Sequence, residues 1–227
     1  MKKAWWLLAA LALGAGKAAA GEAEARKALD EHVGKVERLA RAAAPGFWEG
    51  VVDGQVFYVD DTGRYLFAGG LVDLKTGRNL TAERQFAMLP LNLAFKQVRG
   101  SGKNVLVTFE DPNCGYCKKL AHELQGVKDA TIYTFLYPVL GEDSYEKSKA
   151  IWCAGDRVKA WNGWMLNGTP VGKAPEKCDL AGLQASIELG RKMRINGTPA
   201  MIFGNGDRVP GYMPAAEIEK RFAASAS

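Results

Sequence analysis

Hydrophobic positions change their spacing several times along the chain. Between residues 22 and 44, small and apolar residues recur every three or four positions among charged ones, which predicts an amphipathic helix ending at Pro45-Gly46. Over residues 51–80 the apolar runs become short and alternating, with turn residues such as Asp60-Asp61-Thr62-Gly63 between them. This part of the chain therefore predicts a small antiparallel meander, with strands at residues 55–59, 65–67 and 71–74.

The next segment again has helical spacing, although Pro90 interrupts it. We expect residues 81–102 to form a linker helix that holds two domains apart and closes at Arg99-Gly100-Ser101-Gly102. The N-terminal domain, residues 21–80, has too few elements to bury a sufficient core by itself. We therefore expect this domain to complete its core against a second copy of itself.

From residue 103 to residue 227, predicted strands and helices alternate, which is typical of an α/β domain. Strands are expected at residues 105–109, 130–136 and 200–203, with a short one after Gly204-Asn205-Gly206-Asp207. Helices are expected from the first cysteine to about residue 126, at residues 144–166 and 180–193, and from Pro214 onward.

Residues 1–20 have the order of a secretory signal peptide. Met1-Lys2-Lys3 is followed by an apolar run from Ala4 to Gly16 and then by Ala18-Ala19-Ala20, which suits a cleavage site. The run is shorter than the roughly 20 apolar residues of a spanning helix, so we expect export rather than a membrane anchor. Part of the formal net charge of +5 lies in this segment, so the exported chain is too weakly basic to indicate nucleic-acid binding.

The most informative motif is the pair Cys114 and Cys117, where a predicted strand ends and a predicted helix begins. Unpaired amides at a helix N-terminus stabilise a thiolate, so Cys114 is expected to be the nucleophile. Cys117 lies one helical turn further on, from where it can resolve a mixed disulfide formed at Cys114. A zinc site would need a second close cysteine pair or histidines at ligand spacing, and the sequence has neither, so no metal is expected.

The other two cysteines, Cys153 and Cys178, lie on a predicted helix and in a loop rich in Pro, Lys and Gly. We expect them to form a structural disulfide, which suits an exported chain. A second redox couple is the alternative.

Several stretches occur in a fixed order: Tyr58 to Tyr65, Phe109 to Cys117, Lys149 to Ala154, Asn196 to Ala200, and Val209 to Tyr212. In residues and in order, this set resembles the DsbC/DsbG family of periplasmic disulfide isomerases over essentially the whole exported chain. The resemblance implies a thioredoxin-like catalytic domain with inserted helices, preceded by a small α+β (cystatin-like) dimerisation domain and the linker helix, so that the chain is α+β overall.

The resemblance also implies how such a chain works. Two copies would form a V-shaped homodimer around an apolar cleft that holds misfolded, disulfide-containing exported proteins. A membrane thiol reductase would re-reduce the cysteines, and no bound cofactor would be needed. Gly115 and Tyr116 between the cysteines are similar to the isomerase branch of the family.

The tetrapeptide Asn-Gly-Thr-Pro occurs at residues 167–170 and again at residues 196–199. Thioredoxin-like folds place a cis-proline before a strand and facing the active cysteines. Only the second copy precedes a predicted strand, so the resemblance assigns Thr198 and Pro199 to the site. The first copy is interpreted as a helix stop.

One part of the thioredoxin pattern is missing. Thr108 stands six residues before Cys114, where thioredoxins carry a buried acid, so no proton acceptor for Cys117 can be assigned. Glu110 and Asp111 have no assigned role. The function expected is a disulfide isomerase and reductase, and the alternatives are a net disulfide oxidant and a DsbG-like chaperone that holds unfolded chains.

Overall fold

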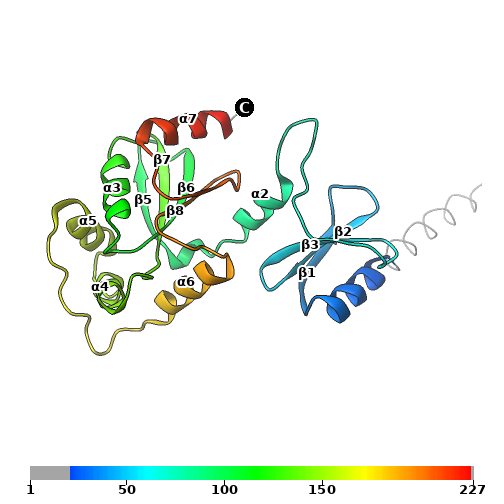
Figure 1. Ribbon diagram of the computed structural model, residues 1–227, viewed down its shortest axis with the longest axis horizontal. Coiled ribbons are helices and arrows are strands. Elements are labelled where there is room, and N and C mark those ends of the chain that lie inside the picture. The colour runs from blue at the N-terminus through cyan, green and yellow to red at the C-terminus, as the bar shows by residue number, and fades with distance from the viewer. Residues whose placement is uncertain (1–20, 226–227) are drawn as a thin grey trace, which may run out of the picture. The chain divides into compact units, whose positions relative to one another are not determined.

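The computed structural model describes residues 21–225, and the chain divides into two compact units between Gln85 and Phe86 (Figure 1). The predicted signal peptide, residues 1–20, lies outside the described residues. None of the helices within residues 21–225 combines the length and the apolar character that a membrane span requires.

The first unit is a helix, residues 21–32, packed on an antiparallel sheet. The strands lie side by side in chain order: β1 (Val36–Arg41), β2 (Phe47–Val52), β3 (Gln55–Asp60) and β4 (Leu66–Phe67). Ala25 and Leu29 of the helix form a core cluster with Trp48 and Val52 of β2. The helix lies so close to β2 that a Cβ at Gly50 would be 2.3 Å from the Leu29 Cδ1 atom.

The helix predicted over residues 22–44 is wrong in its second half. Helical structure ends near residue 32, and β1 begins at Val36 and pairs antiparallel with β2. Gly34, with φ 150°, breaks the helix in a backbone region that favours glycine. Pro45-Gly46 belongs to the connection between β1 and β2, so the sheet has a strand that was not expected.

The third strand of the predicted meander, residues 71–74, is also wrong. Only a single bridge, from Val72 to Asn79, forms in this region. The Asp73 side chain accepts the N–H of Lys75 at 2.8 Å, and the carbonyl oxygen of Asp73 accepts the N–H of Gly77 at 2.7 Å. These bonds close a turn and leave no length of extended chain to pair.

The predicted continuous helix over residues 81–102 is wrong as well. Helix α2 (Leu80–Ala87) ends before Pro90, and a short 3-10 helix, Leu91–Leu93, follows. Strand β5 (Phe95–Arg99) then pairs antiparallel with β7. Proline supplies no helical N–H, and β7 offers this segment a partner for its backbone groups.

The second unit is a mixed sheet with helices around it (Figure 1). The strand order is β5-β7-β6-β8-β9, and only β6 and β7 run parallel. The remaining strands are β6 (Asn104–Glu110), β7 (Ala130–Leu136), β8 (Ala200–Phe203) and β9 (Arg208–Pro210). The helices are α3 (Gly115–Glu123), α4 (Glu142–Trp152), α5 (Arg157–Asn167), α6 (Ala181–Lys192) and α7 (Ala215–Ser225).

The central strand β6 is buried on both faces, as its nearly continuous apolar sequence requires. Leu106 belongs to a core cluster with residues of α3 and α7, including Leu120 and Ile218. Val107 and Phe109 belong to a second cluster that takes in residues of α4, α5 and α6. The strand is thus fixed from both sides, and its C-terminal end leads into the cysteine motif.

The helix predicted over residues 144–166 is two helices. Helix α4 ends at Trp152, and α5 begins at Arg157 with Asp156 as its N-cap. The Asp156 carboxylate accepts the backbone N–H of Lys159 at 2.9 Å, which satisfies an amide that has no partner within the helix. Gly155 and Asp156 therefore separate the two helices, although the spacing of the apolar residues continues across the break.

Candidate active site

The motif cysteines lie where β6 leads into α3. Cys114 is the N-cap of α3, with φ −72° and ψ 118°, as the sequence predicts. Its Sγ atom accepts a hydrogen bond from the backbone N–H of Cys117 over 3.3 Å. The sulfur therefore lies at a helix N-terminus, where amide donors favour a negative charge.

A second segment reaches Cys114 from a distant part of the chain. The peptide bond between Thr198 and Pro199 is cis, and Pro199 is buried just before β8. The Cys114 thiol donates to the carbonyl oxygen of Thr198, with 3.2 Å between sulfur and oxygen. The second Asn-Gly-Thr-Pro copy thus lies against the cysteines, whereas in the first copy Gly168 is the C-cap of α5.

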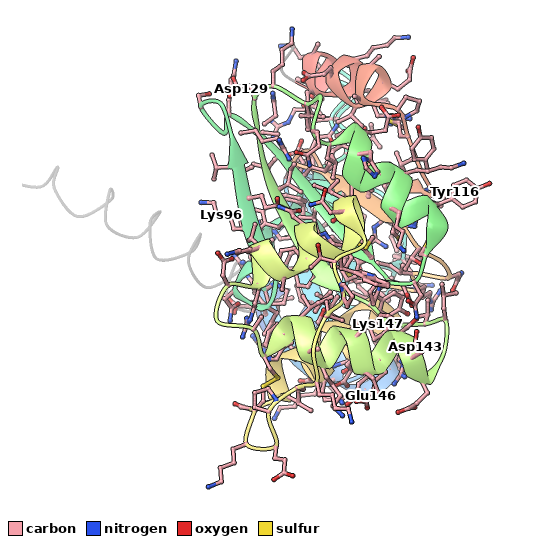
Figure 2. All side chains as sticks on the ribbon, turned by 90° about the vertical axis from the view of Figure 1, so that its left-hand side faces the viewer. Lys96, Tyr116, Asp129, Asp143, Glu146 and Lys147 are labelled. Atoms are coloured by element: carbon pink, nitrogen blue, oxygen red, sulfur yellow. A yellow bond between two sulfur atoms is a disulfide. The ribbon has the colours of Figure 1, made fainter. Side chains whose placement is uncertain are left out.

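The residues between the cysteines face outward. A Cβ at Gly115, the first residue of α3, would meet nothing within 4 Å. Tyr116 is 60% exposed and projects from α3 in Figure 2, with its ring centroid 6.4 Å from that of Tyr212. Cys114 is 6% exposed and Cys117 is fully buried, so Cys114 is the sulfur that an incoming molecule can reach.

Asp111 fixes the loop that precedes the cysteines. Its Oδ1 atom accepts the backbone N–H of Asn113 at 2.7 Å and the hydroxyl of Ser144 at 2.8 Å. Its Oδ2 atom accepts the backbone N–H groups of Val139 at 2.8 Å and Leu140 at 3.0 Å. This fully buried carboxylate therefore ties α4 and the segment after β7 to the cysteine loop.

Trp164 of α5 supports the same loop from another helix. Its indole N–H donates to the carbonyl oxygen of Pro112 at 2.6 Å. The ammonium groups of Lys118 and Lys147 lie 4.4 Å and 5.0 Å from centroids of the Trp164 ring system. Figure 2 shows Lys147 beside Asp143, its ion-pair partner on α4. No motif in the sequence indicates these contacts, because they join residues far apart in the chain.

Glu110, which the sequence left without a role, is the last residue of β6 and is 1% exposed. Its Oε1 atom accepts the hydroxyl of Thr108 at 2.7 Å, and that hydroxyl oxygen lies 3.0 Å from the hydroxyl of Thr134 on β7. Its Oε2 atom has no hydrogen-bond partner among the described residues. Burial raises the pKa of Glu110 to about 7, although the bond from Thr108 acts in the opposite direction.

The Cys117 thiol is buried in a hydrophobic core cluster. Burial raises the pKa of Cys117 far above its usual range, and the charge of the Glu110 carboxylate raises it further. The two acids are therefore coupled, since the negative charge of one opposes ionisation of the other.

Cys153 and Cys178 are joined by a disulfide, with their Cα atoms 5.9 Å apart. The bond connects the C-cap of α4 to the loop before α6. Cys114 and Cys117 are free thiols. Within residues 21–225, no group of three or more His, Cys, Asp or Glu side chains is arranged to hold a metal ion.

Known proteins match both units of the chain. Residues 91–226 match the family model of a thioredoxin-like domain, and residues 16–82 match the disulfide bond isomerase protein N-terminal domain. The probable thiol:disulfide interchange protein DsbC of Bordetella avium (strain 197N) is 40% identical over 196 residues, which cover 83% of this chain and 70% of that protein. The thiol:disulfide interchange protein DsbC of Escherichia coli (strain K12) is 31% identical over 229 residues, covering 97% of this chain and 95% of that protein.

A solved structure shares the fold over part of the chain. The disulfide interchange protein from Neisseria gonorrhoeae matches 60% of this chain and 97% of that chain, with 38% identity and a TM-score of 0.56. The expected thioredoxin-like domain, and the N-terminal domain of the type found in disulfide isomerases, are both confirmed. The chain belongs to the DsbC family of thiol:disulfide interchange proteins.

Proposed function

We propose that this chain is a periplasmic thiol:disulfide isomerase and reductase that works through Cys114 and Cys117. The observation that carries the proposal is the position of the Cys114 sulfur, which accepts the N–H of Cys117 at 3.3 Å and lies 3.2 Å from the carbonyl oxygen of Thr198. When Cys114 ionises, the bond to the carbonyl is lost, but the amide donor at the helix N-terminus stays in place to stabilise the thiolate.

In the proposed cycle, the Cys114 thiolate attacks one sulfur of an incorrect disulfide in an exported protein. A bond forms between Cys114 and that sulfur, and the other substrate sulfur leaves as a thiolate. A different substrate thiolate then displaces Cys114. The substrate keeps a rearranged disulfide, the enzyme returns unchanged, and no electrons are transferred overall.

Cys117 acts when no substrate thiol displaces Cys114. Its sulfur bonds to the Cys114 sulfur, and the substrate leaves in its reduced form. The oxidised enzyme then needs a reductant, and the family resemblance implies a membrane thiol reductase. Neither route uses a bound cofactor.

The surroundings of Cys114 suit contact with unfolded chains. Tyr116, Val139 and Leu140 are all exposed apolar side chains, and the last two are tied by their N–H groups to Asp111 in the cysteine loop. We assign Gly115, Tyr116, Thr198 and Pro199 the role of shaping the place where a substrate disulfide meets Cys114. Apolar contacts of this kind suit substrates that have not buried their own cores.

The first unit supports the proposed homodimer. Strand β4 lies at the edge of its sheet, and Leu66 and Phe67 are 47% and 49% exposed there. An exposed apolar edge strand is a ready template for pairing with another chain. The exported chain should therefore have the mass of a dimer at micromolar concentration, and a monomeric mass would remove the dimer from the proposal.

The activity test is recovery of native protein from a scrambled multi-disulfide substrate in a mildly reducing glutathione buffer. Recovery should vanish in Cys114→Ala and survive in part in Cys117→Ala, because only Cys114 is needed for rearrangement. If the intact chain gives no recovery, isomerisation is excluded.

The exposed apolar side chains also support a holdase role as a second candidate. A chain carrying Cys114→Ala and Cys117→Ala together would then still suppress aggregation of an unfolded protein. Suppression that disappears with the two thiols would exclude this role.

A further inference from the structure

Glu110 is a buried carboxyl group that the proposed cycle does not use. It is 1% exposed, and only one of its two side-chain oxygens has a hydrogen-bond partner among the described residues. An unpaired buried carboxylate oxygen is costly, because the group has lost its water without full replacement. Such groups are concentrated at sites where a change of protonation is used.

The resolving step needs a proton acceptor for Cys117. Cys117 must lose its proton to attack Cys114, yet it is fully buried, and burial opposes its ionisation. The carboxylate of Asp111 already accepts four donors and has no free site. Both histidines, His32 and His122, are exposed, and Thr108 carries no acid.

The fold brings Glu110 to Cys117 through the geometry of β6. Thr108 and Glu110 are two residues apart on this strand, so their side chains lie on the same face. The Thr108 hydroxyl holds one carboxyl oxygen, and the other is left open. Glu110 ends β6 four positions before Cys114, and Cys117 is fully buried in the first turn of the helix that follows the cysteine loop. The opposition of the Glu110 charge to ionisation of Cys117 agrees with this placement.

We propose that Glu110 is the proton acceptor for Cys117 when the mixed disulfide at Cys114 is resolved. This inference rests on the proposed dithiol function. The Cys117 proton passes to the open oxygen of the ionised carboxyl group. The Cys117 sulfur bonds to the Cys114 sulfur, the bond from Cys114 to the substrate breaks, and its electron pair leaves with the substrate thiolate.

The transfer avoids a second charge in the interior. Before it, the negative charge lies on Glu110; afterwards it lies on Cys117 until the new disulfide forms, and Glu110 is neutral. The pKa of Glu110, raised by burial to about 7, keeps both protonation states populated near neutral pH. A base with a pKa near the working pH is the most effective general base.

The test uses the reduced full chain and dithiobis(nitrobenzoate), whose thiolate product is coloured. One coloured thiolate is released when Cys114 attacks, and a second is released when Cys117 resolves the mixed disulfide. In Glu110→Gln we expect an unchanged first phase and a second phase slowed on the order of 100-fold, the range for loss of a general base. The second phase of the natural chain should accelerate with pH through about 7, and that of the variant should lack this step.

Glu146→Gln is the matched control. Glu146 is exposed on α4 and pairs with Lys149, and Figure 2 shows it on that helix, so neither phase should change. A second phase that is equally fast in Glu110→Gln would overturn the inference. Loss of the first phase from the natural chain would instead refute the nucleophilic role of Cys114 in the proposed function.

Thr108→Val provides an independent reading if Glu110→Gln fails to fold. It removes the donor that lowers the pKa of Glu110 and keeps the carboxyl group. The pH midpoint of the second phase should therefore move upward, whereas a purely structural Glu110 would leave the midpoint where it is. An unchanged midpoint would contradict the inference.

Discussion

Replacing Asp111 by asparagine tests how the cysteine loop is held. The side chain keeps its size, but one oxygen becomes an NH2 group that can only donate. Oδ2 faces two backbone N–H groups, whereas Oδ1 faces one N–H group and the hydroxyl of Ser144. Because a hydroxyl can turn and accept, we expect the NH2 group at the Oδ1 position. Only the N–H of Asn113 then loses its acceptor.

The expected loss of stability follows from these contacts. One hydrogen bond to a charged group contributes about 1.5–3 kcal/mol, and three others weaken from charged to neutral bonds by about 1 kcal/mol each. The free energy of unfolding should therefore fall by about 5 kcal/mol, a large share of the total stability of an ordinary domain.

Urea unfolding followed by tryptophan fluorescence measures this loss, since Trp152, Trp161 and Trp164 all lie in the second unit. Asp143→Asn is the control of the same chemistry. Asp143 is exposed and also bonds Asn113, through the side-chain amide at 2.7 Å, so its unfolding midpoint should hardly move. A loss below about 1 kcal/mol in Asp111→Asn would refute the assignment of Asp111 as the residue that fixes the loop.

Three further outcomes are expected. Removing the disulfide with Cys153→Ala and Cys178→Ala should lower the free energy of unfolding by about 3.5 kcal/mol in urea titrations, since the closed loop spans 25 positions; an unchanged midpoint would contradict this. Glu110 takes up a proton on folding because its pKa rises from 4.5 to about 7, so its contribution to stability is full below 4.5 and is lost as the pH rises through about 7. The free energy of unfolding of the natural chain, relative to that of Glu110→Gln, should thus fall by up to about 3 kcal/mol between pH 4.5 and pH 8. If the two chains show the same pH dependence, the raised pKa of Glu110 is excluded. Gly190→Ala places a Cβ 2.4 Å from the Tyr137 ring and should cost about 1–3 kcal/mol by thermal unfolding, with a smaller effect in a Tyr137→Leu background.

The sequence predicts those elements best whose limits are set locally. The strand expected at residues 130–136 is β7, Ala130–Leu136, because Lys128-Asp129 and Pro138 flank a run of apolar, aromatic and β-branched residues. The residue spacing of Val36–Arg41 fits a helix as well as a strand, and its pairing with β2 decides between the two structures. Strand β5 likewise depends on β7, which lies more than 30 positions further along the chain.

The residues of the site also differ in whether the sequence alone predicts their roles. Cys114, Cys117, Thr198 and Pro199 stand in motifs that can be read directly, whereas the roles of Asp111 and Trp164 depend on partners brought together by folding. The sequence does contain a signal for Glu110, namely an acid at the end of a strand that is mostly apolar. This signal can be interpreted only once the structure shows that the strand is buried on both faces.

The disulfide between Cys153 and Cys178 makes this chain a product of disulfide chemistry as well as a proposed catalyst of it. Four cysteines can pair in three ways, and the bond present joins neighbours in sequence rather than crossing between the pairs. In the proposed export from the N-terminus, Cys114 and Cys117 would emerge first, then Cys153, then Cys178. An oxidant that joins cysteines in this order would pair Cys114 with Cys117 and Cys153 with Cys178, and the second of these bonds is the disulfide present in the structure.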